Sequence, residues 1–311
     1  MNPATAPTGG LGLLAAASWG GSDFAGGIGA RKGPALLVTL AGQAVSLFVL
    51  LALAAALHPA APGWRAALFA ASGGFEGALA LALFYRALAM GAMGLTAALT
   101  GLITALVPVL FSTLQDGLPP PVCAAGVVSG CAAIWLITHR PLTESRHTPP
   151  AALVFAAIAG AGFGTQLVLF RLAERCAAAR GLSSPAGLVA IMASARAAGV
   201  AALVAVVLAP VAFGAFGAFA APPAAGSPAV RRKMNPGCGL IAAGAGLLDT
   251  AGNLLYLGAA QLGRLDAAAV ICSLYPAGTI LLAALFLREK PSRRQLAGIG
   301  MALAAVALLS R

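Results

Sequence analysis

Apolar runs follow one another along nearly the whole of this 311-residue chain. Each run is almost free of charge and is long enough to cross a bilayer. A helix needs about 20 residues to cross the hydrocarbon core, because each residue adds about 1.5 Å. The ten runs that meet this length lie near 10–30, 34–57, 66–88, 92–115, 120–138, 151–173, 184–210, 238–261, 265–287 and 294–310. The sequence therefore predicts an all-α polytopic membrane protein with ten transmembrane helices.

The composition excludes a soluble globular domain. Hydrophobic residues make up 60% of the chain and charged residues only 9%, against about 45–50% and about 25% in soluble domains. The net charge is +11, but nearly all Lys and Arg residues fall in loops or at span ends, where they set topology and contact anionic lipid head groups. We therefore expect a multi-pass protein of the cytoplasmic membrane, with the lipid bilayer rather than nucleic acid as its partner.

The two halves of the chain show ordered internal similarity. The third and eighth spans each place a Tyr near the same end, Tyr85 and Tyr256, and the fourth and ninth each carry a proline, Pro108 and Pro276. An odd number of spans per unit forces the second unit to run inverted in the bilayer, which is typical of inverted-repeat secondary transporters. The predicted units are a first five-helix repeat, a linker and a second five-helix repeat, at 1–139, 140–150 and 151–311.

Small residues four apart recur in the last span of each unit, as Gly126 with Gly130 and Gly298 with Ala302. This spacing favours close helix packing. It fits packing inside one monomer better than a dimer seam, so a monomer and a homodimer both stay open.

Three segments resemble the EamA-type carriers of the drug/metabolite transporter superfamily. They are LLAAASWGGSDF (13–24), GLLDTAGNLLYLGA (246–259) and ICSLYPAGTILLAALFLREKPSRRQLAGIGMALAAVAL (271–308). The resemblance implies ten spans, cytoplasmic termini and transport of small organic solutes, often outward. The charge distribution disagrees on orientation: loops after odd-numbered spans hold about twice as many basic residues as the other side, which would place the termini outside the cytoplasm.

Four charged residues fall toward the middle of expected spans: Asp23, Glu76, Arg196 and Asp249. A charged side chain near the bilayer centre costs at least about 2.5–3.5 kcal/mol, so each is a candidate for function. Arg196 could neutralise one acid while hydrogen bonds hold the others, but three acids against one base leave a surplus. A carboxylate without a partner at this depth could carry a proton near neutral pH, so Glu76 and Asp249 are the candidates for proton coupling.

Helical spacing extends the predicted solute site. Asp249, Asn253 and Tyr256 stand at i, i+4 and i+7 and share one face of a helix, as do Trp19 and Asp23. The alternative for these polar residues is that they hold helices together.

The prolines add a further element to the predicted site. Tyr275 stands directly before Pro276, where proline removes a backbone donor. We therefore treat Pro108 and Pro276 as candidate helix breaks that shape a cavity.

The chain holds none of the GxxxxGK[ST], HExxH or GxSxG motifs, which leaves a primary pump and common membrane hydrolases without support. We expect no cofactor and no metal, and no enzymatic activity. The favoured function is a secondary active transporter of small organic solutes, working outward with possible proton coupling. The alternatives are an uncoupled facilitator or importer and, from another class, a membrane enzyme or lipid-handling protein.

Overall fold

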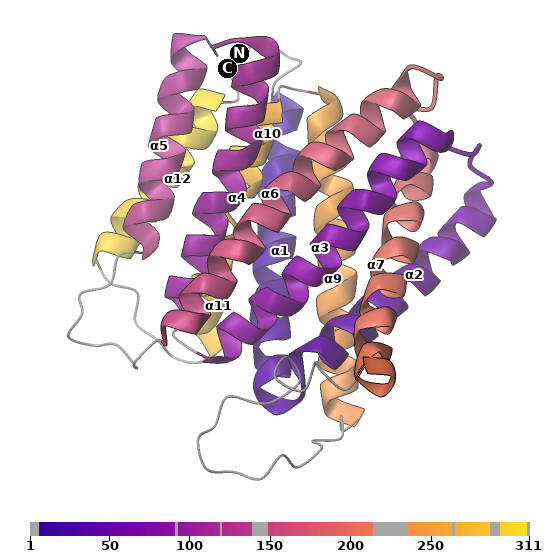
Figure 1. Cartoon of the computed structure of the whole chain (residues 1–311). Helices are drawn as coiled ribbons and strands as arrows, with labels where there is room; N and C mark the ends of the chain where they lie inside the picture. Colours follow the sequence, from indigo (N-terminus) through magenta and orange to yellow (C-terminus); the bar gives the residue numbers. More distant parts are fainter. Residues whose placement is uncertain are drawn as a thin grey trace.

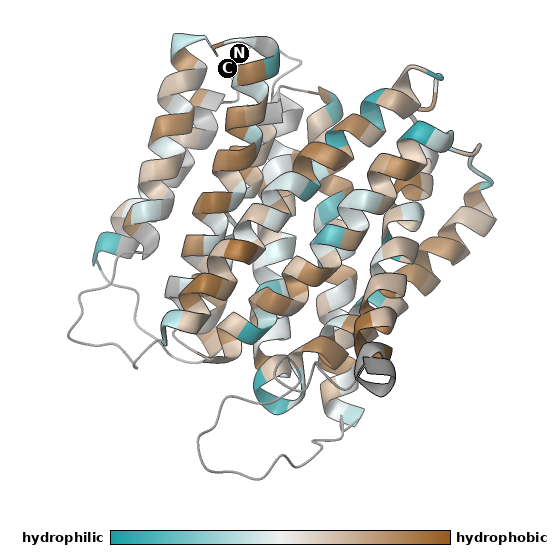
Figure 2. Cartoon of the chain, in the orientation of Figure 1, coloured by the Kyte–Doolittle hydropathy of each residue, from teal (hydrophilic) through white to brown (hydrophobic). Residues whose placement is uncertain are grey.

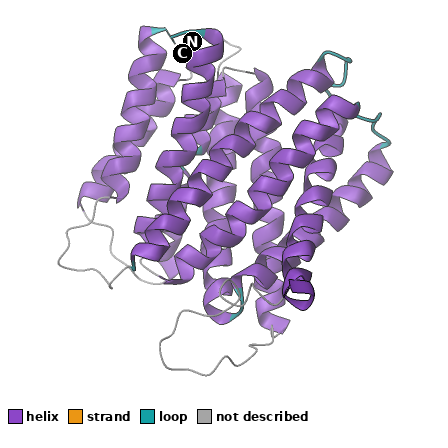
Figure 3. Ribbon diagram, viewed as in Figure 1, coloured by secondary structure: helices purple, strands orange, loops and turns teal. Residues whose placement is uncertain are grey.

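The computed structural model describes residues 6–90, 93–118, 120–138, 149–213, 236–262, 265–286 and 293–309. Within these ranges the chain is helical, without strands (Figure 3). The helices are α1 (Ala6–Lys32), α2 (Ala35–Leu57), α3 (Trp64–Met90), α4 (Met93–Asp116), α5 (Pro121–Thr138), α6 (Pro150–Ala178), α7 (Pro185–Phe213), α9 (Pro236–Leu262), α10 (Leu265–Cys272), α11 (Tyr275–Phe286) and α12 (Arg293–Leu309). The predicted linker at 140–150 falls almost entirely outside the described residues.

Every apolar run found in the sequence coincides with a helix, and the ninth run coincides with two, α10 and α11. Four helices, α5, α6, α7 and α9, begin at a proline, the residue whose missing N–H costs nothing in a first helical turn. Within the described residues, five helices are long and apolar enough to cross a membrane: α2, α3, α6, α7 over Pro185–Leu208, and α9. For the other segments, membrane crossing and the inverted repeat stay predictions.

The outside of the bundle carries large apolar side chains that a soluble protein would bury. Phe48, Leu114 and Leu240 are 74%, 79% and 77% exposed. Many of the hydrophilic residues lie near helix ends and in loops (Figure 2). Both features suit a surface solvated by lipid tails.

Helices of the early and late parts of the chain interleave throughout the bundle (Figure 1). The most extensive contacts are α3 with α6 and α1 with α9, followed by α5 with α12, α3 with α7 and α4 with α6. The bundle also pairs α2 with α7 and with α9, and α1 with α11. In Figure 1, α1 begins and α12 ends at the same end of the bundle.

Glycines permit the closest of these helix crossings. A Cβ placed on Gly246 of α9 would overlap the backbone of Gly42 on α2, and one on Gly74 of α3 would overlap the backbone of Ala195 on α7. Without side chains at these positions the helix backbones approach directly, as in other small-residue contacts between membrane helices. The α2–α9 and α3–α7 crossings each join a helix of the first half of the chain to one of the second.

The small residues of α5 also pack within the chain. A Cβ on Gly130 would meet Val270 of α10 at 2.5 Å and Ala305 of α12 at 3.7 Å. Gly130 therefore packs against α10 and α12 of its own chain. For the corresponding pair in the last span, Gly298 with Ala302, the Ala302 side chain is not among those that the structure describes.

Candidate functional site

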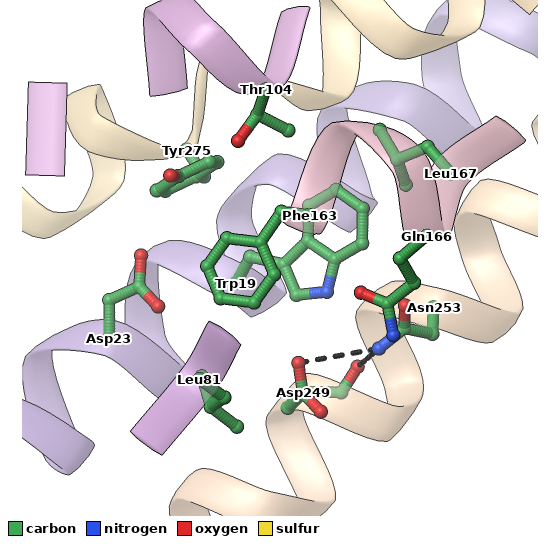
Figure 4. Close-up of a pocket in the computed structure, with 10 residues that line it drawn as sticks. All are labelled: Trp19, Asp23, Leu81, Thr104, Phe163, Gln166, Leu167, Asp249, Asn253 and Tyr275. Atoms are coloured by element: carbon green, nitrogen blue, oxygen red, sulfur yellow. Dashed lines mark hydrogen bonds between the residues drawn. The ribbon is translucent and has the colours of Figure 1, made fainter. Parts of the chain in front are cut away.

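A cavity lies at the centre of the bundle and has about 370 Å³ of empty space, its open side included. Its wall is built from three helices of the first half, α1, α3 and α4, and three of the second, α6, α9 and α11. The lining residues are Trp19, Asp23, Leu81, Thr104, Phe163, Gln166, Leu167, Asp249, Asn253 and Tyr275 (Figure 4). Five of the eight residues proposed from sequence to bind solute are thus in one wall.

Behind this wall, Arg196 of α7 is held by two side chains from other helices. Its guanidinium donates to the Asp249 carboxylate of α9 and, at 2.6 Å, to Gln43 Oε1 of α2. The Arg196 and Asp249 side chains are 5% and 13% exposed. A buried charge of either sign needs such a partner. The ion pair joins α7 to α9, and the hydrogen bond to Gln43 joins α7 to α2.

Asn253 completes the network one helical turn after Asp249. Its Nδ2 donates to the Asp249 carbonyl at 2.8 Å and to Asp249 Oδ1 at 3.3 Å (dashed lines, Figure 4). Its Oδ1 is buried and has no hydrogen-bond partner within the described ranges. One face of α9 therefore presents a neutralised carboxylate and a free amide oxygen.

Asp23 lies in a different environment from Asp249. The residue is 5% exposed, and its Oδ2 has no hydrogen-bond partner in the part of the chain that the structure describes. No salt bridge to Asp23 is present there either. Asp23 is thus the carboxyl of the cavity that lacks a compensating group.

Aromatic rings fill the space between the two acids. Trp19 packs against Tyr256 with ring centroids 6.2 Å apart and edge-on against Tyr275 at 6.3 Å. Phe84 packs edge-on against Phe163 at 5.8 Å. These separations fall within the range in which aromatic pairs attract, so the cavity has an aromatic middle.

Tyr256 is close to the cavity without lining it. Its hydroxyl donates to the Leu167 carbonyl at 2.8 Å, from α9 to α6. Tyr85, its predicted counterpart, makes the corresponding link from α3 to α1, where its hydroxyl lies 3.1 Å from Ser22 Oγ. Both tyrosines therefore join the third helix of their half to the first.

The two candidate helix breaks differ. The ninth predicted span is interrupted at Ser273 and Leu274, directly before Tyr275 and Pro276, and α11 starts there. The interruption brings the Tyr275 side chain into the cavity wall, and Pro276 lies against Gly101 of α4. Pro108, in contrast, lies inside α4, and the helix continues through it without the predicted break.

Glu76 is the sequence candidate that the fold keeps apart from the cavity. It is half-buried on α3 and does not line the cavity. A Cβ on Gly162 of α6 would lie 3.7 Å from Glu76 Cγ, so Glu76 borders the α3–α6 contact. The three mid-span acids therefore occupy three distinct environments.

Sequence reasoning missed four polar or aromatic residues of this region: Gln43, Thr104, Phe163 and Gln166. Gln43 and Gln166 are amides inside apolar runs, a signal that could have placed them beside the four charges. Phe163 and Thr104 carried no such signal, because both are common in membrane helices. Within the described ranges, no three His, Cys, Asp or Glu residues group as metal ligands would.

A multi-helix membrane bundle with a cavity lined by aromatic and polar side chains from both halves of the chain has the architecture of a membrane transporter. The model of the EamA-like transporter family matches residues 177–311. Over these residues the chain is similar to the EamA-like transporter family, of the drug/metabolite transporter type, and the resemblance seen in the C-terminal motifs is confirmed there.

One solved structure, titled "Crystal structure of protein", is similar to the chain at a TM-score of 0.66 and 18% identity, covering 97% of this chain and 95% of that one. At this identity the similarity concerns the fold alone. The curated proteins contain no match to the sequence.

Proposed function

We propose that this protein is a secondary active transporter that exports small organic solutes across the cytoplasmic membrane by alternating access. The observation that supports the proposal best is the composition of the cavity wall. The first, third and fourth helices of one half, α1, α3 and α4, face the first, third and fourth segments of the other, α6, α9 and α11. A solute site between two such halves is the arrangement that lets one half rock against the other.

The packing pairs support two inverted five-helix repeats. The counterparts in the two halves are α1 and α6, α2 and α7, α3 and α9, and α4 and α11. When each helix is replaced by its counterpart, the α3–α6 contact becomes α9–α1, α3–α7 becomes α9–α2, and α4–α6 becomes α11–α1, and all of these contacts are present. The α2–α7 and α5–α12 contacts map onto themselves. The matching hydrogen bonds of Tyr85 and Tyr256 follow the same exchange.

Proton coupling is the second part of the proposal, with Asp249 and Glu76 as the exchanging groups. Asp249 is paired with Arg196 in this conformation, so a proton would replace the guanidinium when α7 and α9 move apart. Glu76 is half-buried beside α6 and can exchange protons without disturbing that pair.

The test is transport into proteoliposomes with and without an imposed proton gradient, using amino acids, purines, sugars and organic amines as solutes. We expect one solute class to accumulate above its equilibrium level, and a protonophore to abolish the accumulation. Equilibration without accumulation would indicate an uncoupled facilitator or importer, and a chemically changed product would indicate a membrane enzyme.

Asp249→Asn is expected to lower gradient-driven transport at least about tenfold, because the amide cannot exchange a proton. Glu76→Gln is the companion variant. If both variants retain gradient-driven transport at the wild-type rate, the proton-coupling role of these two carboxylates is wrong, although transport itself stands.

A further inference from the structure

The charges lining the cavity do not balance. Two carboxyl groups, Asp23 and Asp249, line it, and no Lys or Arg is among the lining residues that the structure describes. Arg196, behind the wall, pairs with Asp249. When this pair is counted as neutral, the Asp23 carboxyl is left as the charge that the surrounding protein does not compensate.

Two acceptors in the wall lack a donor. Asp23 Oδ2 and Asn253 Oδ1 are both buried and both without a hydrogen-bond partner in the described part of the chain. The residues are 5% and 2% exposed, so their polar atoms are withdrawn from bulk water at a cost unless a partner arrives. A single proton on Asp23 would satisfy that carboxyl but leave the Asn253 oxygen unpaired, whereas a solute with several N–H donors can satisfy both.

The space between these acceptors is aromatic. In Figure 4, Asp23 lies on one side of the Trp19 and Phe163 rings, and Asn253 and Asp249 lie on the other. Tyr275 borders the Asp23 side. Aromatic faces attract organic cations, and the attraction strengthens where water is excluded. An anion would meet two carboxyl groups and no free base in the same space.

We propose that the cavity binds a protonated organic amine, with its ammonium group on the Asp23 carboxylate, its apolar part between Trp19 and Phe163, and a further donor toward Asn253. This inference rests on the proposed function, since it names the solute class of the same cavity. It makes Asp23, rather than Asp249, the residue that recognises the charge of the solute.

The experiment measures binding alone, with the full-length protein in lipid nanodiscs and isothermal titration calorimetry at pH 7. The probe is 4-(2-aminoethyl)phenol, an amine that is protonated at this pH and carries a phenolic O–H donor at its far end. The comparison compound is the alcohol 4-(2-hydroxyethyl)phenol, which has nearly the same shape without charge. Empty nanodiscs give the contribution of partition into lipid, which is subtracted. The wild-type protein should bind the amine at least about tenfold more tightly than the alcohol.

Asp23→Asn keeps the size of the side chain and removes its charge, so the preference for the amine over the alcohol should fall to within about twofold. The matched control is Glu174→Gln, which changes a buried acid that is paired with Arg171 at 2.9 Å and does not line the cavity. This control should keep the wild-type preference. Size-exclusion chromatography and melting temperature verify that each variant is folded, and the comparison of the two probes on the wild type needs no variant.

Equal binding of amine and alcohol, no binding of either, or an amine preference that survives Asp23→Asn would overturn the inference. Transport of an anionic or neutral solute without amine binding would refute the solute class while the proposed function stands. Amine binding that depends on Asp23, in a protein that accumulates no solute in proteoliposomes, would refute the proposed function and keep the site.

Discussion

Removing either member of the Arg196–Asp249 pair should destabilise the protein more than removing both. In Asp249→Asn, Arg196 keeps Gln43 as an acceptor but loses the opposite charge. In Arg196→Met, Asp249 keeps only the amide of Asn253, at 3.3 Å from Oδ1. Each single variant therefore leaves an uncompensated charge in a place where the side chains are only 5% and 13% exposed.

The expected magnitude follows from that burial. Breaking a buried ion pair on one side costs about 3–5 kcal/mol, while replacing both members by uncharged groups costs far less. Neutral hydrogen bonds between membrane helices are worth only about 0.6 kcal/mol on average and at most about 1.7. The double variant should therefore be more stable than the sum of the singles predicts, with a coupling energy above about 2 kcal/mol.

The assay is unfolding by SDS in mixed micelles, followed by far-UV circular dichroism, for the wild type, both single variants and the double variant. Thr165→Val is the control, because the exposed Thr165 hydroxyl bonds only to the Ala161 carbonyl of its own helix; it should change stability by less than about 0.5 kcal/mol. A coupling energy below about 0.5 kcal/mol for Arg196 and Asp249 would refute the reasoning, since the two charges would then act independently.

Two further variants test the packing with the same unfolding assay. Gly246→Ala should destabilise the protein by more than about 2 kcal/mol, because the new methyl group would overlap the Gly42 backbone and overpacking strains a close contact. The control is Gly244→Ala, whose Cβ meets nothing within 4 Å. This variant should be stabilised by up to about 1 kcal/mol, because Ala has a higher helix propensity than Gly. Equal effects at the two glycines would contradict the α2–α9 contact. Tyr256→Phe removes the 2.8 Å bond to the Leu167 carbonyl and should cost between about 0.6 and 1.7 kcal/mol. An unchanged or raised free energy of unfolding would show that this bond does not stabilise the protein.

The helices could be predicted closely from sequence. Backbone groups in lipid must be satisfied within their own segment, so a long apolar run leaves few alternatives to a helix, and α2 at Ala35–Leu57 matches its predicted run at 34–57 to within a residue. The interruption before Pro276 followed from local chemistry too. Pro108 did not behave the same way, because a helix can continue through a proline where neighbours accommodate it, and the surroundings of Pro108 are set by other helices.

The candidate site was predictable in membership and only partly in arrangement. Trp19 and Tyr275 could be proposed from their positions, one on the helix face of Asp23 and the other directly before Pro276. Asp23, Asp249 and Asn253 could be proposed because polar side chains in a span are costly unless they are used. Gln43 could have been added on the same reasoning. Glu76 met the same criterion, yet it lies outside the cavity, because the rotation of α3 about its axis depends on its contacts with α6 and α7.

The sequence by itself determined that this chain forms apolar helices, that few charges fall within them, and that three acids face one base at mid-depth. Only the tertiary structure decided which acid Arg196 neutralises. Asp249 stands 53 positions away in the chain, and the pair forms because Gly42 and Gly246 let α2 approach α9 closely while α7 packs on both. Charge pairing depends on distances between helices, which local sequence does not encode, so the unpaired role of Asp23 became visible only in the folded bundle.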